Sequence, residues 1–104
     1  MAGRIKKGKP KVTGRARATQ DQGYVYVLGS TGKGGVRTYV GWTLDLERRL
    51  LQHNNGRGAR STRGRAWLLL YAEQLATRED AMRREWHLKR DRRFRKRLLE
   101  LWEG

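Results

Sequence analysis

The stretch from Thr38 to Asn54, TYVGWTLDLERRLLQHN, decides the fold because its pattern changes within a few residues from that of a strand to that of a helix. Its first four residues include β-branched and aromatic side chains and end on a glycine, which is typical of a strand that reaches a turn. Leucines then recur at helical spacing, at Leu46, Leu50 and Leu51. The stretch therefore predicts a strand that leads directly into an amphipathic helix.

The polar face of this predicted helix carries candidate catalytic residues. Asp45, Arg49 and His53 are spaced by four, so they lie above one another on one face of the helix. The preceding strand would deliver Tyr39 beside them, and this combination predicts half of a site for phosphodiester chemistry. Structural explanations are also open: Asp45 and Arg49 can form an ion pair, and Thr43 or Asp45 can cap the helix. His53 can interact with the negative end of its own helix.

Upstream of this stretch the sequence predicts a β-hairpin. Residues 23–28, GYVYVL, have the composition of a strand, and residues 29–35, GSTGKGG, form a flexible glycine-rich loop. Residues 36–41 then form a second strand, antiparallel to the first because the connection is short. The loop does not match a nucleotide-binding P-loop, which requires a glycine where Val27 stands. Lys33, within the loop, is a candidate phosphate contact.

Downstream, the sequence predicts one more strand and two helices. Residues 57–65, RGARSTRGR, predict a mobile cationic surface loop, and the continuous apolar run over residues 67–71 predicts a central strand covered on both faces. Thr77 can cap the next helix, and a last amphipathic helix is expected over about residues 92–102. We therefore predict a small α+β domain over residues 21–104, in which helices flank a three-stranded antiparallel sheet in the order β-β-α-β-α-α.

The chain is strongly basic. Its 25 Lys and Arg residues against 10 Asp and Glu residues give a net charge of +15, and an excess of this size indicates a polyanionic partner. Nucleic acid is the expected partner, with ribosome association or a basicity without function as the alternatives. Residues 1–20 have no acidic residue and are expected to form a disordered basic arm, which either contacts phosphates or is a solvated tail. The candidate nucleic-acid contacts in the folded part are Lys33, Arg60, Arg63, Arg65 and Lys89.

The composition also excludes several classes of protein. The chain has no cysteine, which excludes disulfides and thiolate metal sites, and its two histidines argue against a histidine-rich zinc site. The longest apolar run, residues 67–72, is far shorter than the ~20 residues that a membrane span needs. No apolar segment follows the basic N-terminus, so no secretory signal is expected. We expect a cytoplasmic protein that does not enter a membrane.

Several short motifs together resemble those of the GIY-YIG nuclease domain. They are Tyr24-Val25-Tyr26, Tyr39-Val40-Gly41, Arg49, His53-Asn54 and Glu85. The resemblance extends over roughly residues 23–99. The sequence looks closest to the small single-domain bacterial members of that family. It is also similar to the catalytic domain of the eukaryotic structure-specific endonuclease that cuts branched DNA. The first motif reads YVY instead of GIY, so the functional tyrosine is placed at Tyr26, with Tyr24 as the alternative.

The resemblance implies a role for each of five residues. Glu85 would hold a single divalent ion, Mg²⁺ or Mn²⁺, and Arg49 would neutralise negative charge in the transition state. Tyr26, helped by Tyr39, would orient or deprotonate the attacking water. His53, with an ordinary pKa of ~6.5, is the alternative base. Glu85 has a simpler explanation as well, because it can balance a neighbouring cation on its own helix.

The activity implied by the resemblance is metal-dependent endonucleolytic hydrolysis of DNA phosphodiester bonds, in DNA repair or recombination, with RNA as an alternative substrate. A non-catalytic nucleic-acid-binding module on the same fold is the alternative function. Family members with defined targets usually take their specificity from an attached domain or a partner. Since only a basic arm accompanies this domain, we expect either a protein partner that supplies substrate specificity or a low specificity.

Overall fold

The structure is a computed structural model that describes residues 22–103 of the chain. Its elements are β1 (Gly23–Ser30), β2 (Arg37–Thr43), α2 (Leu46–Asn54), the short 3₁₀ helix η3 (Arg60–Thr62), β3 (Leu68–Leu75), α3 (Arg78–Arg90) and α4 (Arg92–Glu103). This confirms the predicted α+β class and the order β-β-α-β-α-α. The predicted basic arm, residues 1–20, lies outside the described residues.

The three strands form one antiparallel sheet in the order β2-β1-β3. The prediction that the apolar run over residues 67–71 is the central strand is therefore wrong, because β1 lies in the centre. The burial of β1 explains this position: Val25 and Val27 are buried on one face of the sheet, and Tyr26 and Leu28 on the other. At the edge, β3 is less enclosed, and 56% of Leu68 is exposed.

The strand β2 is longer than predicted at its C-terminal end. It continues through Gly41 to Thr43, because Trp42 pairs with Val25 and Thr43 pairs with Tyr24 of β1. Gly41 is therefore an interior strand residue opposite Tyr26, and not the end of the strand. This places the glycine within the sheet, directly beside a candidate catalytic side chain.

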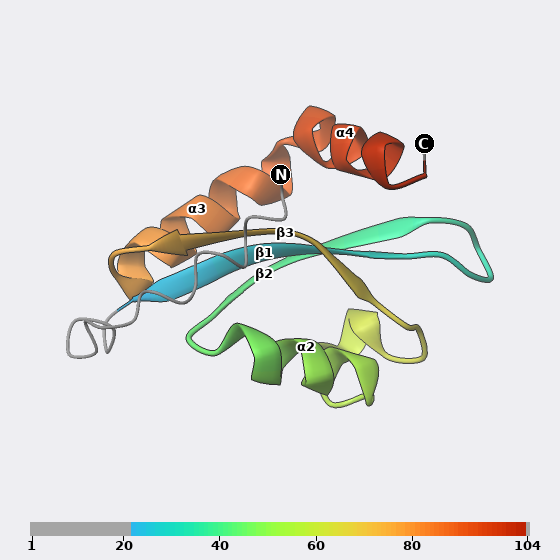
Figure 1. Cartoon of the computed structure of the whole chain (residues 1–104), viewed down its shortest axis with the longest axis horizontal. Coiled ribbons are helices and arrows are strands. Elements are labelled where there is room, and N and C mark those ends of the chain that lie inside the picture. The colour runs from blue at the N-terminus through green and yellow to red at the C-terminus, as the bar shows by residue number, and fades with distance from the viewer. Residues whose placement is uncertain (1–21, 104) are drawn as a thin grey trace.

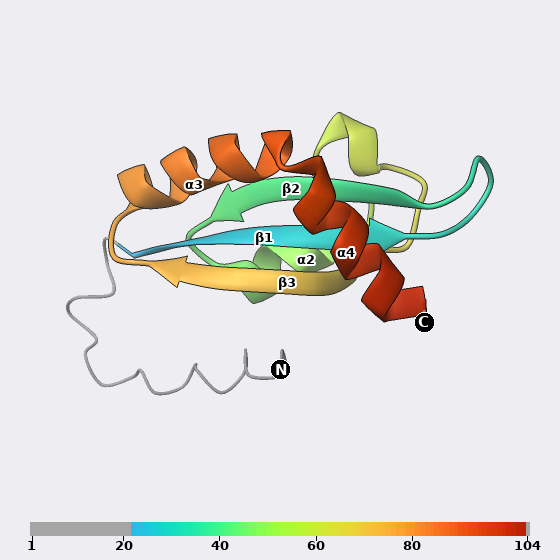
Figure 2. The ribbon, with the colours of Figure 1, turned by 90° about the horizontal axis from the view of Figure 1, so that it is seen from above.

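Helices cover both faces of the sheet. Figures 1 and 2 show α2 and η3 on one face, and α3 and α4 on the other, with α3 running along the β2 side of the sheet. The buried residues accordingly form two clusters. One contains Val25, Val27, Val40 and Leu88 on the side of α3 and α4. The other is built around Tyr26, Leu28 and Trp67 on the side of α2.

The helix ends follow from local sequence. The Asp45 carboxylate caps α2 by accepting a hydrogen bond from the Arg48 backbone N–H (3.1 Å), and Gly56, with φ +82°, follows the end of that helix. Thr77 caps α3 as predicted, since its hydroxyl accepts from the Asp80 backbone N–H at 3.0 Å. Between residues 22 and 103, no helix combines the length and the apolar character needed to cross a membrane.

The loop over residues 57–65 is more ordered than predicted. It contains η3, and Thr62 at the end of η3 is fully buried. The indole N–H of Trp67 donates to the Thr62 carbonyl at 2.8 Å, which holds the loop against the sheet. The prediction of a mobile surface loop is therefore wrong for its central part, because Thr62 and its partners form part of the protein interior.

Candidate active site

Tyr26 and His53 meet in a buried hydrogen bond between the sheet and α2. Tyr26 extends from the central strand toward α2, and His53 lies in the last turn of that helix. The Tyr26 hydroxyl oxygen lies 2.8 Å from His53 Nε2, and the two residues are 1% and 0% exposed. The structure thus joins a residue from the first tyrosine motif to one from the opening stretch.

A third residue, Thr62, determines which atom of this pair carries the proton. His53 Nδ1 lies 2.8 Å from Thr62 Oγ1, and the same hydroxyl donates to the Ala59 carbonyl at 2.9 Å. Since a hydroxyl has only one proton, Thr62 must accept from His53, so Nδ1 carries the hydrogen of the neutral imidazole. Nε2 is then free to accept, and Tyr26 is the donor in the Tyr26–His53 hydrogen bond. His53 is therefore held as a proton acceptor for the tyrosine.

Burial shifts the pKa values of both partners toward their neutral forms. Burial raises the pKa of Tyr26 to about 12; the nearby Arg49 guanidinium acts in the opposite direction, and the Glu85 carboxylate adds to the increase. Burial, with the Arg49 charge, lowers the pKa of His53 to about 4. At neutral pH the free protein therefore contains a neutral phenol that donates to a neutral imidazole.

Tyr39 and Arg49 complete this side of the site. The Tyr39 ring centroid lies 4.8 Å from that of His53 and 6.3 Å from that of Tyr26. Arg49, one turn before His53 on α2, donates from Nη1 to the Gln52 side-chain oxygen at 2.9 Å. Four of the five predicted catalytic residues thus lie together between β1, β2 and α2.

Two glycines allow these side chains to pack so closely. A Cβ at Gly41 would lie 2.6 Å from the Tyr26 hydroxyl oxygen and 3.0 Å from the Tyr39 ring. A Cβ at Gly58 would overlap with the His53 ring. Gly41 is visible in the sequence as the third residue of a recognised motif. Gly58 and Thr62 had no local signal, since both lie in a stretch whose composition is that of a surface loop.

Glu85 comes from a different element than the other four residues. It is on α3, across the sheet from α2, and its Oε2 is 3.4 Å from the Lys89 ammonium. Its side chain is 21% exposed, and its charge reaches Tyr26, whose pKa it helps to raise. Glu85 therefore does form an ion pair on its own helix, with Lys89. The other neighbouring cation, Arg84, pairs instead with Glu73 at 2.8 Å.

The donor atoms around Glu85 restrict the kind of metal site that this chain can form. In the part of the chain from residue 22 to residue 103, no three His, Asp or Glu side chains cluster closely enough to hold a metal ion together. A single partly exposed carboxylate fits Mg²⁺ or Mn²⁺, because these hard ions accept one or two carboxylates and keep several waters. Glu85 is therefore suited to a water-rich site and not to an all-protein cage.

Two structural roles predicted for polar residues of the opening stretch are not found among the described residues. Asp45 caps the helix, and among the described residues no ion pair joins Asp45 to Arg49. Both ring nitrogens of His53 bond to side chains outside its own helix, so His53 does not cap the helix C-terminus. Arg49 and His53 are thus directed toward the interior face of α2, where Tyr26 lies.

The predicted nucleic-acid contacts fall into two groups. Arg65 donates to the Ser30 hydroxyl and to the carbonyls of Lys33 and Gly35, at 3.1, 3.1 and 2.6 Å, so it fastens the hairpin loop to the sheet. Arg65 thus has a structural role in the loop, and its contact with nucleic acid stays a prediction. Lys33, Arg60 and Arg63 are exposed and remain candidate contacts, as does Lys89 beside Glu85.

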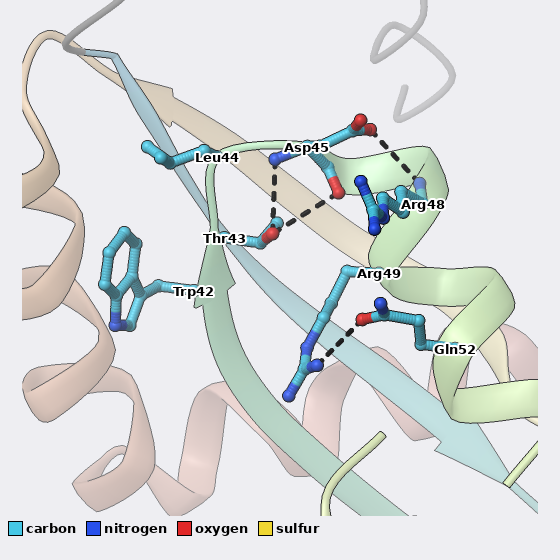
Figure 3. A pocket seen from close by; sticks show the side chains of 7 residues that line it. All are labelled: Trp42, Thr43, Leu44, Asp45, Arg48, Arg49 and Gln52. Carbon is cyan, nitrogen blue, oxygen red and sulfur yellow. Dashed lines mark hydrogen bonds between the residues drawn. The ribbon is translucent and has the colours of Figure 1, made fainter. Parts of the chain in front are cut away.

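A cavity of about 350 Å³ lies at the end of β2 and is bordered by Arg49. Figure 3 shows Arg49 and Gln52 reaching from α2 toward β2, and Trp42 on the other side of that strand. The cavity is lined by Trp42, Thr43, Leu44, Asp45, Arg48, Arg49 and Gln52. A ligand in it would therefore contact the candidate catalytic arginine directly.

The burial of His53 predicts a pH dependence of stability. Its pKa is lower in the folded protein, about 4, than the ordinary 6.5 of the unfolded chain, so protonation favours unfolding. The stabilisation is complete above pH ~6.5 and is lost as pH falls toward about 4. We expect a loss of about 1–3 kcal/mol, allowing for solvent screening. Chemical denaturation at a series of pH values measures it.

The matched comparison uses two histidine variants. His53→Gln should reduce the dependence on pH between about 6.5 and about 4, whereas the exposed His87 can be replaced by glutamine without this effect. Carboxylates titrate over the same pH range in all three proteins. The contribution of His53 is therefore the difference in the pH dependence of stability between the wild type and His53→Gln. Equal pH dependence in wild type and His53→Gln would contradict the buried neutral imidazole.

The chain is similar to several known proteins. A family model described as the GIY-YIG catalytic domain matches residues 22–98. A UPF0213 protein of Oceanobacillus iheyensis is 38% identical over 85 residues, which are 80% of this chain and 95% of that protein. One from Halobacterium salinarum is 42% identical over 62 residues, or 59% of this chain and 80% of that protein.

A solved structure is also similar to this chain. The solution NMR structure of a UPF0213 protein from Bacillus halodurans is 38% identical, covers 77% of this chain and 84% of its own, and has a TM-score of 0.42. The family model and the relative from Oceanobacillus iheyensis both cover most of the present sequence. The chain therefore belongs to the family of GIY-YIG catalytic domains.

Proposed function

We propose that this chain is a metal-dependent endonuclease that hydrolyses phosphodiester bonds in DNA. The observation that carries the proposal is the Tyr26–His53–Thr62 hydrogen-bond chain, with Arg49 beside Tyr26. A protein that only binds nucleic acid has no need of a buried tyrosine whose proton is directed at a buried, neutral imidazole. Membership of the GIY-YIG family supports the same activity.

The hydrogen-bond chain gives a path for one proton. The attacking water transfers a proton to the Tyr26 oxygen as the phenolic proton of Tyr26 moves to His53 Nε2. Tyr26 thereby remains neutral, which its pKa of about 12 requires, and never has to exist as a free phenolate. The resulting imidazolium keeps its Nδ1–H bond to Thr62. Tyrosine orients the water, and histidine is the final acceptor of the proton.

Arg49 neutralises charge on the phosphate. Its guanidinium lies close enough to Tyr26 to influence the pKa of the phenol, so a phosphate bound there would lie next to the attacking water. A planar guanidinium suits two phosphate oxygens at once. Such preorganised charge is usually worth ~10²–10³ in rate when the negative charge grows in the transition state.

Glu85 would hold the divalent ion, Mg²⁺ or Mn²⁺. When bound, that ion supplies Lewis-acid stabilisation of charge on the phosphate and on the leaving oxygen. Glu85 belongs to α3 on one face of the sheet and Arg49 to α2 on the other, so a substrate that reached both would lie across the β2 edge. Lys89 would then give up its 3.4 Å contact with Glu85 to a substrate phosphate.

The charge favours a nucleic acid as substrate, and we propose DNA, with RNA as the alternative. Exposed cations occur in the hairpin loop at Lys33, near η3 at Arg60 and Arg63, and along α4. The α4 residues are Arg92, Arg93, Lys96 and Arg97. Contacts of this kind bind phosphates without reading sequence. We propose in addition a role in DNA repair or recombination in the cytoplasm, with a protein partner that supplies specificity.

The experiment that tests the function is cleavage of labelled DNA with and without Mg²⁺. We expect cleavage that chelation abolishes and that Mg²⁺ restores. Arg49→Ala should lower the rate by ~10²–10³ at saturating DNA. Arg97→Ala, which removes the same charge from α4, should leave the saturated rate within a few-fold. Metal-independent cleavage would refute the metal dependence, and binding without cleavage would favour the non-catalytic module.

A further inference from the structure

The cavity at the end of β2 has a size and a position that the proposed chemistry does not explain. Its volume of about 350 Å³ falls near the lower end of the ~300–1,000 Å³ typical of small-molecule sites. A phosphate held by Arg49 would need only the arginine itself. The space beyond Arg49 can therefore receive the group attached to that phosphate.

The walls of the cavity differ in character. Trp42 and the exposed Leu44 form an apolar side, and Arg48, Arg49 and Gln52 a polar side that comes from α2 (Figure 3). Trp42 lies in register with Val25, whose side chain packs on the α3 face of the sheet. Because β2 is an edge strand, the cavity extends around the edge of the sheet from the α2 face toward the α3 face.

The polar side of the cavity is arranged for an anion joined to a hydrogen-bonding ring. The cavity is lined by the guanidinium groups of Arg48 and Arg49 against the single carboxylate of Asp45, one oxygen of which caps α2, so its lining keeps a net positive charge. Gln52 accepts from Arg49 through its oxygen, so its amide N–H₂ can still donate to a ligand. Trp42 offers an indole against which a flat ring can stack.

From this arrangement we infer that the cavity takes one unpaired nucleotide adjacent to the scissile phosphate. Its base stacks on Trp42, its ring edge accepts from Gln52, and its phosphate contacts Arg49. The inference rests on the proposed function and narrows its substrate class. A base inside a duplex is covered by its neighbours and its partner, so it cannot enter such a cavity without leaving the stack. The preferred substrate is therefore a strand that is unpaired at the cleaved bond.

The test measures binding without any divalent ion, so that it does not depend on cleavage. Fluorescence anisotropy compares a single-stranded oligonucleotide with the fully paired duplex of the same sequence. We expect Trp42→Ala to weaken single-strand binding roughly 5- to 150-fold, the range found when a base-stacking aromatic is removed. Duplex binding should stay within about two-fold. Trp42→Phe, which keeps a stacking ring, should recover much of the single-strand affinity.

Trp86 provides the matched control. It is 53% exposed on α3, and the Arg90 guanidinium covers its ring at 3.8 Å from the centroid. Trp86→Ala should leave the preference for single strands unchanged. A second measurement uses the wild-type protein alone: a single strand in which every nucleotide is abasic should bind more weakly than the same strand with its bases. This measurement does not depend on whether the Trp42 variants fold.

The outcomes separate the cavity from the catalytic proposal. Equal losses on single strand and duplex in Trp42→Ala, or equal binding of the abasic and the normal single strand, would overturn the cavity assignment even if the protein cleaves DNA. Trp42-dependent single-strand binding without cleavage in Mg²⁺ would uphold the cavity and refute the endonuclease. Faster cleavage of an unpaired strand than of the duplex, lost in Trp42→Ala, would support both.

Discussion

Replacing Glu85 by glutamine is expected to lower cleavage at least ~10³-fold while leaving DNA affinity within about two-fold. Glutamine keeps the size of the side chain but removes the charge that would hold a divalent ion. Loss of several kcal/mol of transition-state stabilisation corresponds to a rate loss of this order. Single-turnover cleavage with excess protein measures the effect, and a titration with Mg²⁺ or Mn²⁺ should show that the ion requirement moves to higher concentration.

Two controls distinguish metal binding by Glu85 from its ion pair with Lys89. If Glu85 served only to hold Lys89 at 3.4 Å, Lys89→Ala would remove the same interaction and cause the same loss. An exposed pair of this kind contributes ~0.3–0.5 kcal/mol, far less than the expected catalytic effect. Glu79→Gln, also on α3, controls for the change of net charge. Unchanged cleavage in Glu85→Gln would refute the metal assignment.

The elements of the fold, and the placement of Arg49 and His53 on one face of a helix, could be predicted from local sequence. Period-2 and helical patterns placed the strands and helices, and Thr77 marked the start of α3 correctly. Arg49 and His53, four residues apart, do lie on one face of α2. The placement of Tyr26 and His53 in one site depended on the family resemblance, because 27 residues separate them and no local pattern links them.

The failures concern interactions between distant segments. The apolar run over residues 67–71 and the strand β1 look equally suited to a central position, and only the packing of helices on both faces of β1 decides between them. Thr62 is buried although it stands among arginines, because its hydroxyl bridges His53 and Ala59. Arg65 appears in the sequence as a surface cation, but its donors are directed at hairpin carbonyls.

Replacing Tyr26 by phenylalanine is expected to lower cleavage by ~10²–10⁴, the usual contribution of a residue that takes part in proton transfer. The change removes one oxygen from a 1% exposed side chain, so the packing of the ring against His53 and Tyr39 should persist. His53 Nε2 then loses its donor, and a buried unpaired acceptor costs about 1–3 kcal/mol of stability. Cleavage rates and denaturation midpoints measure the two effects separately.

Tyr24→Phe is the matched control, since Tyr24 lies on the same face of the same strand and is the alternative for the functional tyrosine. It should retain nearly full cleavage; loss of cleavage in Tyr24→Phe with activity retained in Tyr26→Phe would reverse the assignment.

The proton path also predicts the behaviour of a double variant. If Tyr26 passes its proton to His53, removing either residue breaks the same path, so the Tyr26→Phe, His53→Gln double variant should cleave about as slowly as the worse single variant. Multiplied losses would mean that the two residues act independently, and the 2.8 Å hydrogen bond between them would then position the tyrosine without carrying its proton.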